Sequence, residues 1–236
     1  MKNIILLIFN PFLFAKKAYG RALHLIKFYI VRDEVTLEVT RWFRDKGDET
    51  LRLDYPELNE NSIVFDIGGY VGDFAEAINE KYRCKVYIFE PHPKFYKMCV
   101  DRFSSNEKVM PLNYGLSDKD GVFTLSDSLD GSSFLRQHHT NTQGVECQVK
   151  EIFKTLNKLN VANIDLMKIN IEGSEYPLLL HMATKNELTL VNQYQIQFHT
   201  FIDDAVSMRD KIIVALSKTH KRTWCYTFVW ENWRKK

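Results

Sequence analysis

An apolar run that leads into a turn with three glycines limits what this chain can fold into more than any other segment. Residues 64–74 read Val-Phe-Asp-Ile-Gly-Gly-Tyr-Val-Gly-Asp-Phe, which predicts a buried strand, a tight turn and the start of a helix. Glycine is needed where the backbone bends sharply and lies against a ligand, because any Cβ would block the approach. The segment therefore indicates a domain that holds a nucleotide-like cofactor at this turn.

The spacing of the glycines and the acid before them indicate which cofactor fits. Gly68, Gly69 and Gly72 do not match the G-x-G-x-x-G pattern that places a pyrophosphate on a helix N-terminus. Asp66, at the end of the predicted strand, would repel a pyrophosphate but accept hydrogen bonds from the ammonium group of a methionine moiety, directly or through water. Charge therefore favours a cationic cofactor without phosphates.

A second acid follows the next apolar run. Glu90 lies 18 residues beyond Gly72 and closes the run Val-Tyr-Ile-Phe at 86–89. An acid at this place can bind both hydroxyls of a ribose, although alone it would be an ordinary carboxylate at a strand end. Together with the glycine turn, Glu90 is the second predicted cofactor contact.

Short β-branched runs alternate with helical stretches along most of the chain. This alternation is typical of an α/β fold with a mostly parallel sheet and helices on both faces. It breaks at a polar segment, 126–144, which is either filler or an insertion that faces the substrate. The predicted strands are 62–67, 85–89, 109–114, 121–125, 145–150, 164–171, 194–198 and 223–229, the last at a reversed edge; the predicted helices are 34–46, 73–82, 94–103, 152–160, 174–183 and 203–217.

Composition and charge divide the chain into a basic leader and a mildly acidic body. The chain has 236 residues, 45% of them hydrophobic and 26% charged, which suffices for one sizeable core. Six of the 32 basic residues precede the first acid, Asp33, so the rest carries 26 basic and 30 acidic residues. We predict a basic helical N-terminal segment over 1–46 and one cofactor-binding domain over 47–236.

Two hypotheses about the location of the basic leader are open. Its apolar run, 4–14, covers about half of the roughly 20 residues that a membrane-spanning helix needs, and the following Ala-Lys-Lys is a poor signal-cleavage region. From Tyr19 to Ile30 apolar residues recur at helical spacing. This helix either packs on the domain or rests, peripherally, on an anionic membrane surface.

Cysteine and histidine patterns give no sign of a metal. The four cysteines lie far apart without a CxxC pair, so neither a zinc site nor a disulfide framework is indicated, and free thiols fit a reducing cytoplasm. His138 and His139 are adjacent, and neighbouring side chains of an extended segment point to opposite sides. We therefore predict a cytoplasmic protein without a bound metal.

Five motifs in fixed order resemble the FkbM family of methyltransferases and cover roughly residues 62 to 233. They are Asp-Ile-Gly-Gly-Tyr-Val-Gly-Asp at 66–73, Phe-Glu-Pro-His-Pro at 89–93, Gly-Leu-Ser-Asp at 115–118, Lys-Ile-Asn-Ile-Glu-Gly-Ser-Glu at 168–175 and Phe-Val-Trp-Glu at 228–231. The resemblance implies a Rossmann-like class I methyltransferase domain with an antiparallel C-terminal strand. It also implies S-adenosyl-L-methionine as cofactor and transfer of its methyl group to an oxygen, often a sugar hydroxyl.

Carried over residue by residue, the resemblance names the cofactor contacts. They are Asp66, Gly68, Gly69, Tyr70, Gly72, Asp73, Glu90, Ser117 and Asp118. The pair Ser117 and Asp118 either contacts the adenine amino group or forms a simple turn.

Two positions depart from the family pattern. Gly69-Tyr70 stands where the family has Ala-Asn, and we expect the Tyr70 ring to cover the methionine part of the cofactor. Asn170 stands where the family has Asp, so a carboxylate that could bind a cation or orient the acceptor is missing.

Candidate catalytic and substrate-binding residues lie at the ends of two predicted strands, 164–171 and 194–198. Glu172 is placed at the carboxyl edge of the sheet, where α/β folds bind ligands, and Glu175 either assists it or caps the following helix. His199 ends the strand predicted at 194–198, and histidine is a common general base, although a lone histidine is often structural. Lys168 and Asn170 share one face of their strand. We expect both to contact the substrate, with Lys168 paired to Glu172 or to an acidic group of the substrate.

The resemblance favours an O-methyltransferase that acts on a sugar hydroxyl of a glycan or surface polysaccharide, in polysaccharide biosynthesis. A protein, lipid or small metabolite is an alternative acceptor, and a cofactor-binding module without turnover is an alternative that Asn170 suggests. Nucleic acid is disfavoured as a partner, because base methylation usually needs a strongly basic surface for phosphates.

Overall fold

The computed structural model describes residues 33–125 and 144–236. The predictions for the leader up to residue 32, for the polar segment and for His138 and His139 therefore lie outside the described residues. Within them, the main sheet has seven strands in the order β3-β2-β1-β7-β8-β10-β9. The strands are β1 (Ile63–Ile67), β2 (Lys85–Phe89), β3 (Val109–Leu112), β7 (Ile164–Ile169), β8 (Val191–Ile196), β9 (His220–Tyr226) and β10 (Trp230–Lys235).

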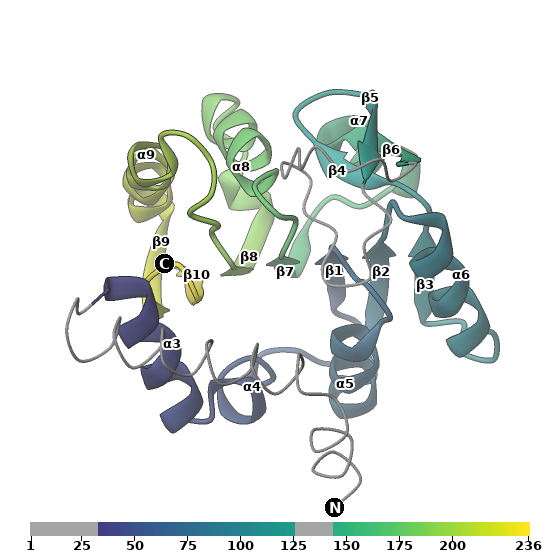
Figure 1. Cartoon of the computed structure of the whole chain (residues 1–236). Helices are drawn as coiled ribbons and strands as arrows, with labels where there is room; N and C mark the ends of the chain where they lie inside the picture. The colour runs from purple at the N-terminus through teal and green to yellow at the C-terminus, as the bar shows by residue number, and fades with distance from the viewer. Residues whose placement is uncertain (1–32, 126–143) are drawn as a thin grey trace, which may run out of the picture.

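Helices cover both faces of this sheet, as Figure 1 shows. The helices α7, α8 and α9 lie on one face, and α5 and α6 lie on the other together with α3 and α4, which lie below the C-terminal strands. The bounds are α3 (Glu34–Arg44), α4 (Gly47–Thr50), α5 (Asp73–Tyr82), α6 (Pro93–Arg102), α7 (Ile152–Leu159), α8 (Glu175–Thr184) and α9 (Ala205–Thr219), with a 3-10 turn at Leu188–Leu190. The α/β fold class predicted from the sequence is confirmed.

A small second sheet interrupts the alternation after β3. It consists of β4 (Gly115–Ser117), β6 (Val145–Glu151) and β5 (Gly121–Leu125), in the order β4-β6-β5. The strands β5 and β6 pair antiparallel and bracket the polar segment, whereas β4 and β6 pair parallel. The strand β4 is missing from the sequence prediction, because three residues carry too little periodicity to be recognised.

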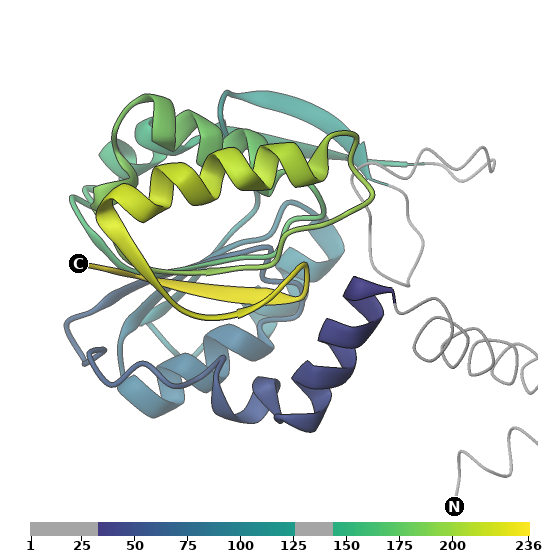
Figure 2. The ribbon, with the colours of Figure 1, turned by 90° about the vertical axis from the view of Figure 1, so that its left-hand side faces the viewer.

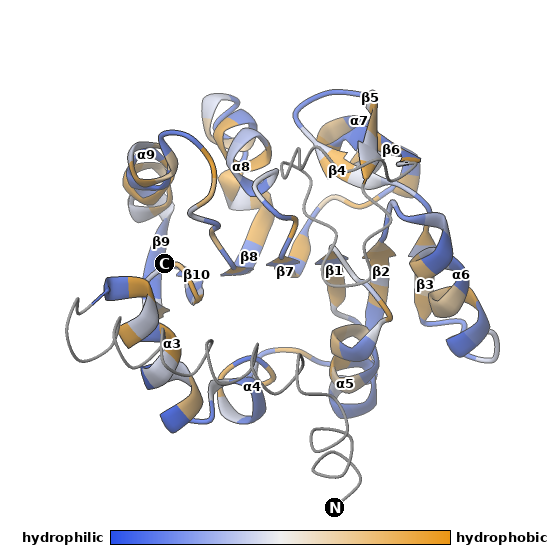
Figure 3. Cartoon of the chain, viewed as in Figure 1, coloured by the Kyte–Doolittle hydropathy of each residue, from blue (hydrophilic) through white to orange (hydrophobic). Residues whose placement is uncertain are grey.

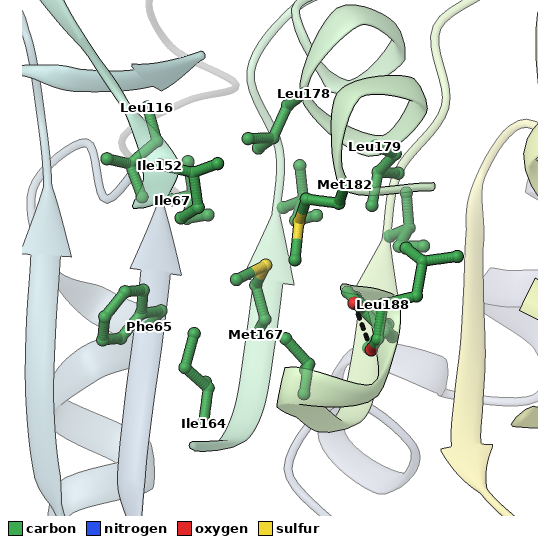
Figure 4. Packing of buried hydrophobic residues seen from close by; sticks show 14 of the residues in the cluster. Phe65, Ile67, Leu116, Ile152, Ile164, Met167, Leu178, Leu179, Met182 and Leu188 are labelled. Carbon is green, nitrogen blue, oxygen red and sulfur yellow. Dashed lines mark hydrogen bonds between the residues drawn. The ribbon is translucent and has the colours of Figure 1, made fainter. Parts of the chain in front are cut away.

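Apolar side chains fill the space on both faces of the sheet. The larger cluster joins β1, β7 and β8 to α7, α8 and α9, and Figure 4 shows Phe65, Ile67 and Met167 of the strands facing Leu178 and Met182 of α8. The second cluster lies under β1 and β2 against α5 and α6. Figure 3 shows apolar residues along the central strands and on the sheet side of the helices. These strands are buried on both faces, as is usual for parallel sheets.

The C-terminal part corrects the sequence prediction. One strand was predicted at 223–229, at a reversed edge, but the structure has two strands that form a hairpin. The second, β10, runs antiparallel to both β8 and β9 and lies between them, so the antiparallel strand is internal and the edge strand β9 runs parallel to β8. The periodicity of β10 is hidden because its buried residues include Glu231 and Asn232.

The first described helix packs on this hairpin. Trp42 of α3 forms a small cluster with Tyr226, Val229 and Trp230, and the Trp42 and Tyr226 rings lie edge to face, 5.0 Å apart. A domain boundary at residue 46 stays a prediction. No helix among the described residues has both the length and the hydropathy that a membrane span requires.

Candidate functional site

The glycine turn, residues 68–72, joins β1 to α5 and leaves no room for side chains at its glycines. Gly68 has φ +81°, and a Cβ there would lie 2.0 Å from the carbonyl oxygen of Asn170. Gly72 has φ +88°, and its Cβ would lie 2.6 Å from the Phe103 ring. Positive φ favours glycine, so both the backbone conformation and the space explain these residues.

A cavity of about 380 Å³ lies beside this turn, at the carboxyl ends of β1, β2 and β7. Five of the predicted site residues line it: Gly68, Tyr70, Glu90, Asn170 and Glu172. The other lining residues are Pro91, Phe95, Gly115, Leu116, Leu125, Val149, Ile171 and Ser174. The cavity therefore has a mostly apolar wall with a few polar groups, which is typical of cofactor sites.

Glu90 is fixed in this cavity by two backbone donors. Its Oε2 accepts from the backbone N–H of Tyr70 at 2.8 Å, and its Oε1 accepts from that of His92 at 2.9 Å. Burial raises the pKa of Glu90 to about 7, although the two N–H groups act in the opposite direction. Because a carboxylate offers about four acceptor positions, two remain for a pair of ligand hydroxyls.

Asp66 and Lys168 form a buried ion pair beneath the turn. The register of β1 and β7 places them directly side by side. The Lys168 Nζ donates to Asp66 Oδ1 and to the Gly68 carbonyl oxygen, both at 2.8 Å. Lys168 therefore pairs with Asp66 and not with the predicted Glu172, while its contact with the substrate stays a prediction. Lys168 instead ties the end of β1 to the glycine turn.

Two buried oxygens near the turn have no hydrogen-bond partner among the described residues. They are Oδ2 of Asp66 and Oδ1 of Asn170. An unpaired buried acceptor is costly, so these atoms are ready to accept from donors of a ligand or from water. Asn170 lines the cavity, whereas Asp66 lies behind its wall.

Tyr70 stands at the mouth of the cavity. Its φ is +51°, in the left-handed region, and its side chain is 50% exposed. The ring packs on Phe95 at a centroid distance of 4.4 Å. This position is compatible with the predicted cover over the cofactor, and Phe95 is a lining residue that the sequence analysis did not identify, since nothing sets it apart from other apolar residues of α6.

Five other predicted cofactor contacts are not among the lining residues: Gly69, Gly72, Asp73, Ser117 and Asp118. Asp73 begins α5 and pairs with Arg102 at 2.6 Å, with its side chain largely exposed. Ser117 Oγ donates to Asp118 Oδ1 at 2.9 Å, and Gly115 and Leu116, just before them, line the cavity instead. The 115–118 motif thus supplies its first half to the cavity.

The predicted catalytic residues come together in one place, here named the His199 corner and made of Glu172, Glu175 and His199. The buried Glu175 carboxylate lies 3.0 Å from His199 Nδ1 through Oε1, which also accepts from the His199 backbone N–H at 2.9 Å. Its Oε2 accepts from the Gly173 backbone N–H at 2.7 Å. Glu175 therefore both binds the backbone before α8 and orients the imidazole.

On the other side of the ring, His199 Nε2 faces Glu172. The distance from Nε2 to Glu172 Oε2 is 3.8 Å, longer than a hydrogen bond. Glu172 has φ +51° and lines the cavity. An imidazole that donates Nδ1–H to one carboxylate keeps Nε2 free as a proton acceptor. His199 and Glu175 do not line the cavity themselves, but Nε2 lies 3.8 Å from Glu172, which does. Among the described residues no group of three or more metal-ligating side chains is present.

Residues 66–227 match the model of the methyltransferase FkbM domain. A segment of 57 residues is 42% identical to a probable ribosomal RNA small subunit methyltransferase A of Methanococcoides burtonii, over 24% of this chain and 21% of that protein.

Two solved structures illustrate the likeness of fold. A methyltransferase FkbM of Methylobacillus flagellatus is 10% identical, with a TM-score of 0.48, over 75% of this chain and 44% of that one. Aeropyrum pernix fibrillarin, with natively bound S-adenosyl-L-methionine, is 8% identical, with a TM-score of 0.45, over 78% of this chain and 70% of that one. The chain thus spans less than half of the FkbM structure.

Proposed function

Because this chain belongs to the FkbM family of methyltransferases, we propose that it transfers the methyl group of S-adenosylmethionine to an oxygen, and that the acceptor is a sugar hydroxyl of a glycan. Methyl transfer and the cofactor follow from the family itself. The oxygen, the sugar and a place in polysaccharide biosynthesis are proposals. The observation that supports these proposals is the arrangement of Glu172, Glu175 and His199 in the His199 corner.

The residues around the glycine turn fit the cofactor. Glu90 keeps acceptor positions for the two ribose hydroxyls, and the apolar wall with Phe95 and Leu116 suits the adenine ring. The unpaired Oδ2 of Asp66 can accept, through water, from an ammonium group. When bound, S-adenosylmethionine supplies an electrophilic methyl group on a sulfonium.

The His199 corner supplies a base for the acceptor. A hydroxyl must lose its proton as the new C–O bond forms, and a positioned base typically contributes about 10²- to 10⁴-fold to such a step. Glu175 accepts Nδ1–H and so keeps His199 Nε2 available to take that proton. The Glu172 carboxylate, 3.8 Å from Nε2, would then stabilise the imidazolium.

Two polar residues of the cavity lining, Asn170 and Glu172, support a sugar as the acceptor. Both residues line the cavity, and Glu172 Oε2 lies 3.8 Å from His199 Nε2; an amide and a carboxylate can together bind neighbouring hydroxyls. Such contacts align the reacting oxygen, and alignment alone can lower a barrier by roughly 7 to 11 kcal/mol in favourable cases.

The test is methyl transfer from labelled S-adenosylmethionine to a panel of glycans, with protein and lipid fractions in parallel. We expect labelled glycan with the parent chain and a loss of about 10²-fold or more with His199→Ala, while cofactor binding by calorimetry stays unchanged. His181→Ala is the matched control, because His181 pairs with Glu151 and does not line the cavity.

Two results would contradict the proposal. Label in protein or lipid but not in any glycan would exclude the sugar acceptor. Undiminished turnover by His199→Ala would remove His199 as the base and leave the methyltransferase assignment standing.

A further inference from the structure

A second hollow lies at the opposite edge of the sheet from the cofactor cavity. It has a volume of about 610 Å³ and is lined by Lys221, Arg222, Thr223, Arg234, Lys235 and Lys236. Because β10 runs antiparallel, its last residues lie at the amino ends of the parallel strands. Figure 2 shows this arrangement, with the chain end at one side and the turn between β9 and β10 at the other.

Five of the six lining residues carry a positive charge, and few acids balance them. Arg234 pairs with Glu57 at 2.6 Å, and Arg222 lies 3.8 Å from Glu231. Glu231 is already bound to Arg209 at 2.9 Å inside the protein. Within residues 33–125 and 144–236, no ion pair involves Lys221, Lys235 or Lys236.

The strand register brings like charges face to face. Lys221 of β9 lies directly opposite Arg234 of β10, and such a pair of like charges destabilises a hairpin. Figure 3 shows β9 as largely hydrophilic. Because this arrangement lowers the stability of the hairpin, the positive charges indicate a surface that binds a negatively charged ligand.

Two of the ammonium groups are held in place by the backbone. Lys235 Nζ donates to the Thr189 carbonyl oxygen, and Lys236 Nζ donates to the Ser217 carbonyl oxygen, both at 2.8 Å. An ammonium group has three donors, so two remain on each lysine for a ligand. The backbone thus anchors two of the five charged side chains around the hollow.

We propose that this hollow binds a phosphate group, carried by a soluble phosphate ester or by a lipid headgroup. Lysine and arginine side chains are the usual partners of phosphate oxygens. The lining comes from two stretches of three residues, 221–223 and 234–236, so the hollow suits one phosphate or diphosphate better than the backbone of a nucleic acid, which needs charges along an extended track. The site is separate from the cofactor cavity and does not depend on the proposed acceptor.

Calorimetry with inorganic pyrophosphate tests the soluble source. We expect binding by the full chain that weakens with added salt, and about tenfold or greater loss of affinity in the double variant Lys221→Gln, Lys235→Gln. The double variant Lys97→Gln, Lys119→Gln removes two exposed lysines elsewhere and should bind as the parent does. Unchanged binding of S-adenosylmethionine shows that each variant is folded.

Co-sedimentation with vesicles tests the lipid source. Binding to phosphatidylglycerol vesicles but not phosphatidylcholine vesicles, lost in the Lys221 and Lys235 variant, would assign the phosphate to a headgroup. The proposal is overturned if the parent binds neither pyrophosphate nor anionic vesicles better than that variant does. It is also overturned if a single-stranded RNA oligomer binds the hollow and pyrophosphate does not.

Discussion

The glycine turn and the His199 corner lie at the same edge of the sheet, yet they are built in different ways. The turn is contiguous in sequence and is shaped by backbone conformation, with positive φ at Gly68, Tyr70 and Gly72. The corner is shaped by side chains, with Glu175 bound to a histidine 24 residues further on. Substitutions in the turn should therefore act on folding and cofactor binding, whereas substitutions in the corner should act on turnover.

The largest effect is expected at Gly68. Its replacement by alanine places a Cβ 2.0 Å from the Asn170 carbonyl oxygen at a φ of +81°, so we expect the free energy of unfolding to fall by about 3 kcal/mol and cofactor binding to be lost. Denaturant unfolding and calorimetry measure both. The control is Gly121→Ala, whose Cβ would meet its nearest neighbour at an ordinary 3.5 Å; equal stability of the two variants would refute the steric account.

The next largest effect is expected at Glu175, and it distinguishes the His199 corner from the glycine turn. Glu175→Gln leaves one carbonyl oxygen to serve three donors, namely the N–H groups of Gly173 and His199 and the ring Nδ1. We expect turnover to fall about 100-fold or more and the pH profile of turnover to change, with little change in cofactor affinity. A variant that lost cofactor affinity and turnover in equal proportion would show that the corner and the turn are not independent.

A smaller effect concerns pH and the turn region. Burial raises the pKa of Glu90 to about 7 from 4.5, and the neutral form is a poorer acceptor for ribose hydroxyls. Cofactor affinity should therefore rise about tenfold between pH 6 and pH 8, as calorimetry can measure. Glu90→Gln should bind weakly and without this pH dependence; a parallel rise in the variant would assign the titration to another group.

The raised pKa of Glu90 also makes the stability of the fold depend on pH, in the direction opposite to that of cofactor affinity. A carboxyl group whose pKa is higher in the folded chain stabilises the fold below its unfolded pKa, here 4.5, and loses this contribution as the pH rises through about 7. The cofactor-free chain should thus lose stability over the range in which it gains cofactor affinity. Thermal unfolding with and without cofactor shows whether the two trends cross.

The smallest effect is expected at Tyr70. Asparagine tolerates its φ of +51° better but loses the ring contact with Phe95, so Tyr70→Asn should change the free energy of unfolding by less than about 1 kcal/mol. If the ring covers the cofactor, affinity should fall severalfold. Unchanged affinity would leave Tyr70 without a role in binding.

The sequence predicts most accurately those helices and strands whose bounds depend on residues that are close in the chain. The helix at 73–82 and the strand at 85–89 agree with the structure at both ends, because period and glycine placement are local signals. The Asp66 and Lys168 pair, 102 residues apart, has no local signal. The position of both residues at the carboxyl edge was predictable, but not that Lys168 turns to Asp66.

The same reasoning explains the error at the C-terminus. Glu231 and Asn232 are buried because Arg209 and the Tyr194 carbonyl oxygen bind them, and a polar residue with a distant partner reads as exposed in the sequence. The His199 corner was found only as candidates, since the strand ends place Glu172, Glu175 and His199 near one edge. Their mutual contacts required the structure.

The insertion of β10 between β8 and β9 also fixes the order in which a nascent chain can complete itself. All strands from β1 to β9 leave the ribosome before residues 230–235, so one side of β8 stays an unpaired edge until β10 emerges. Chains stalled before residue 230 therefore expose a strand edge that invites aggregation.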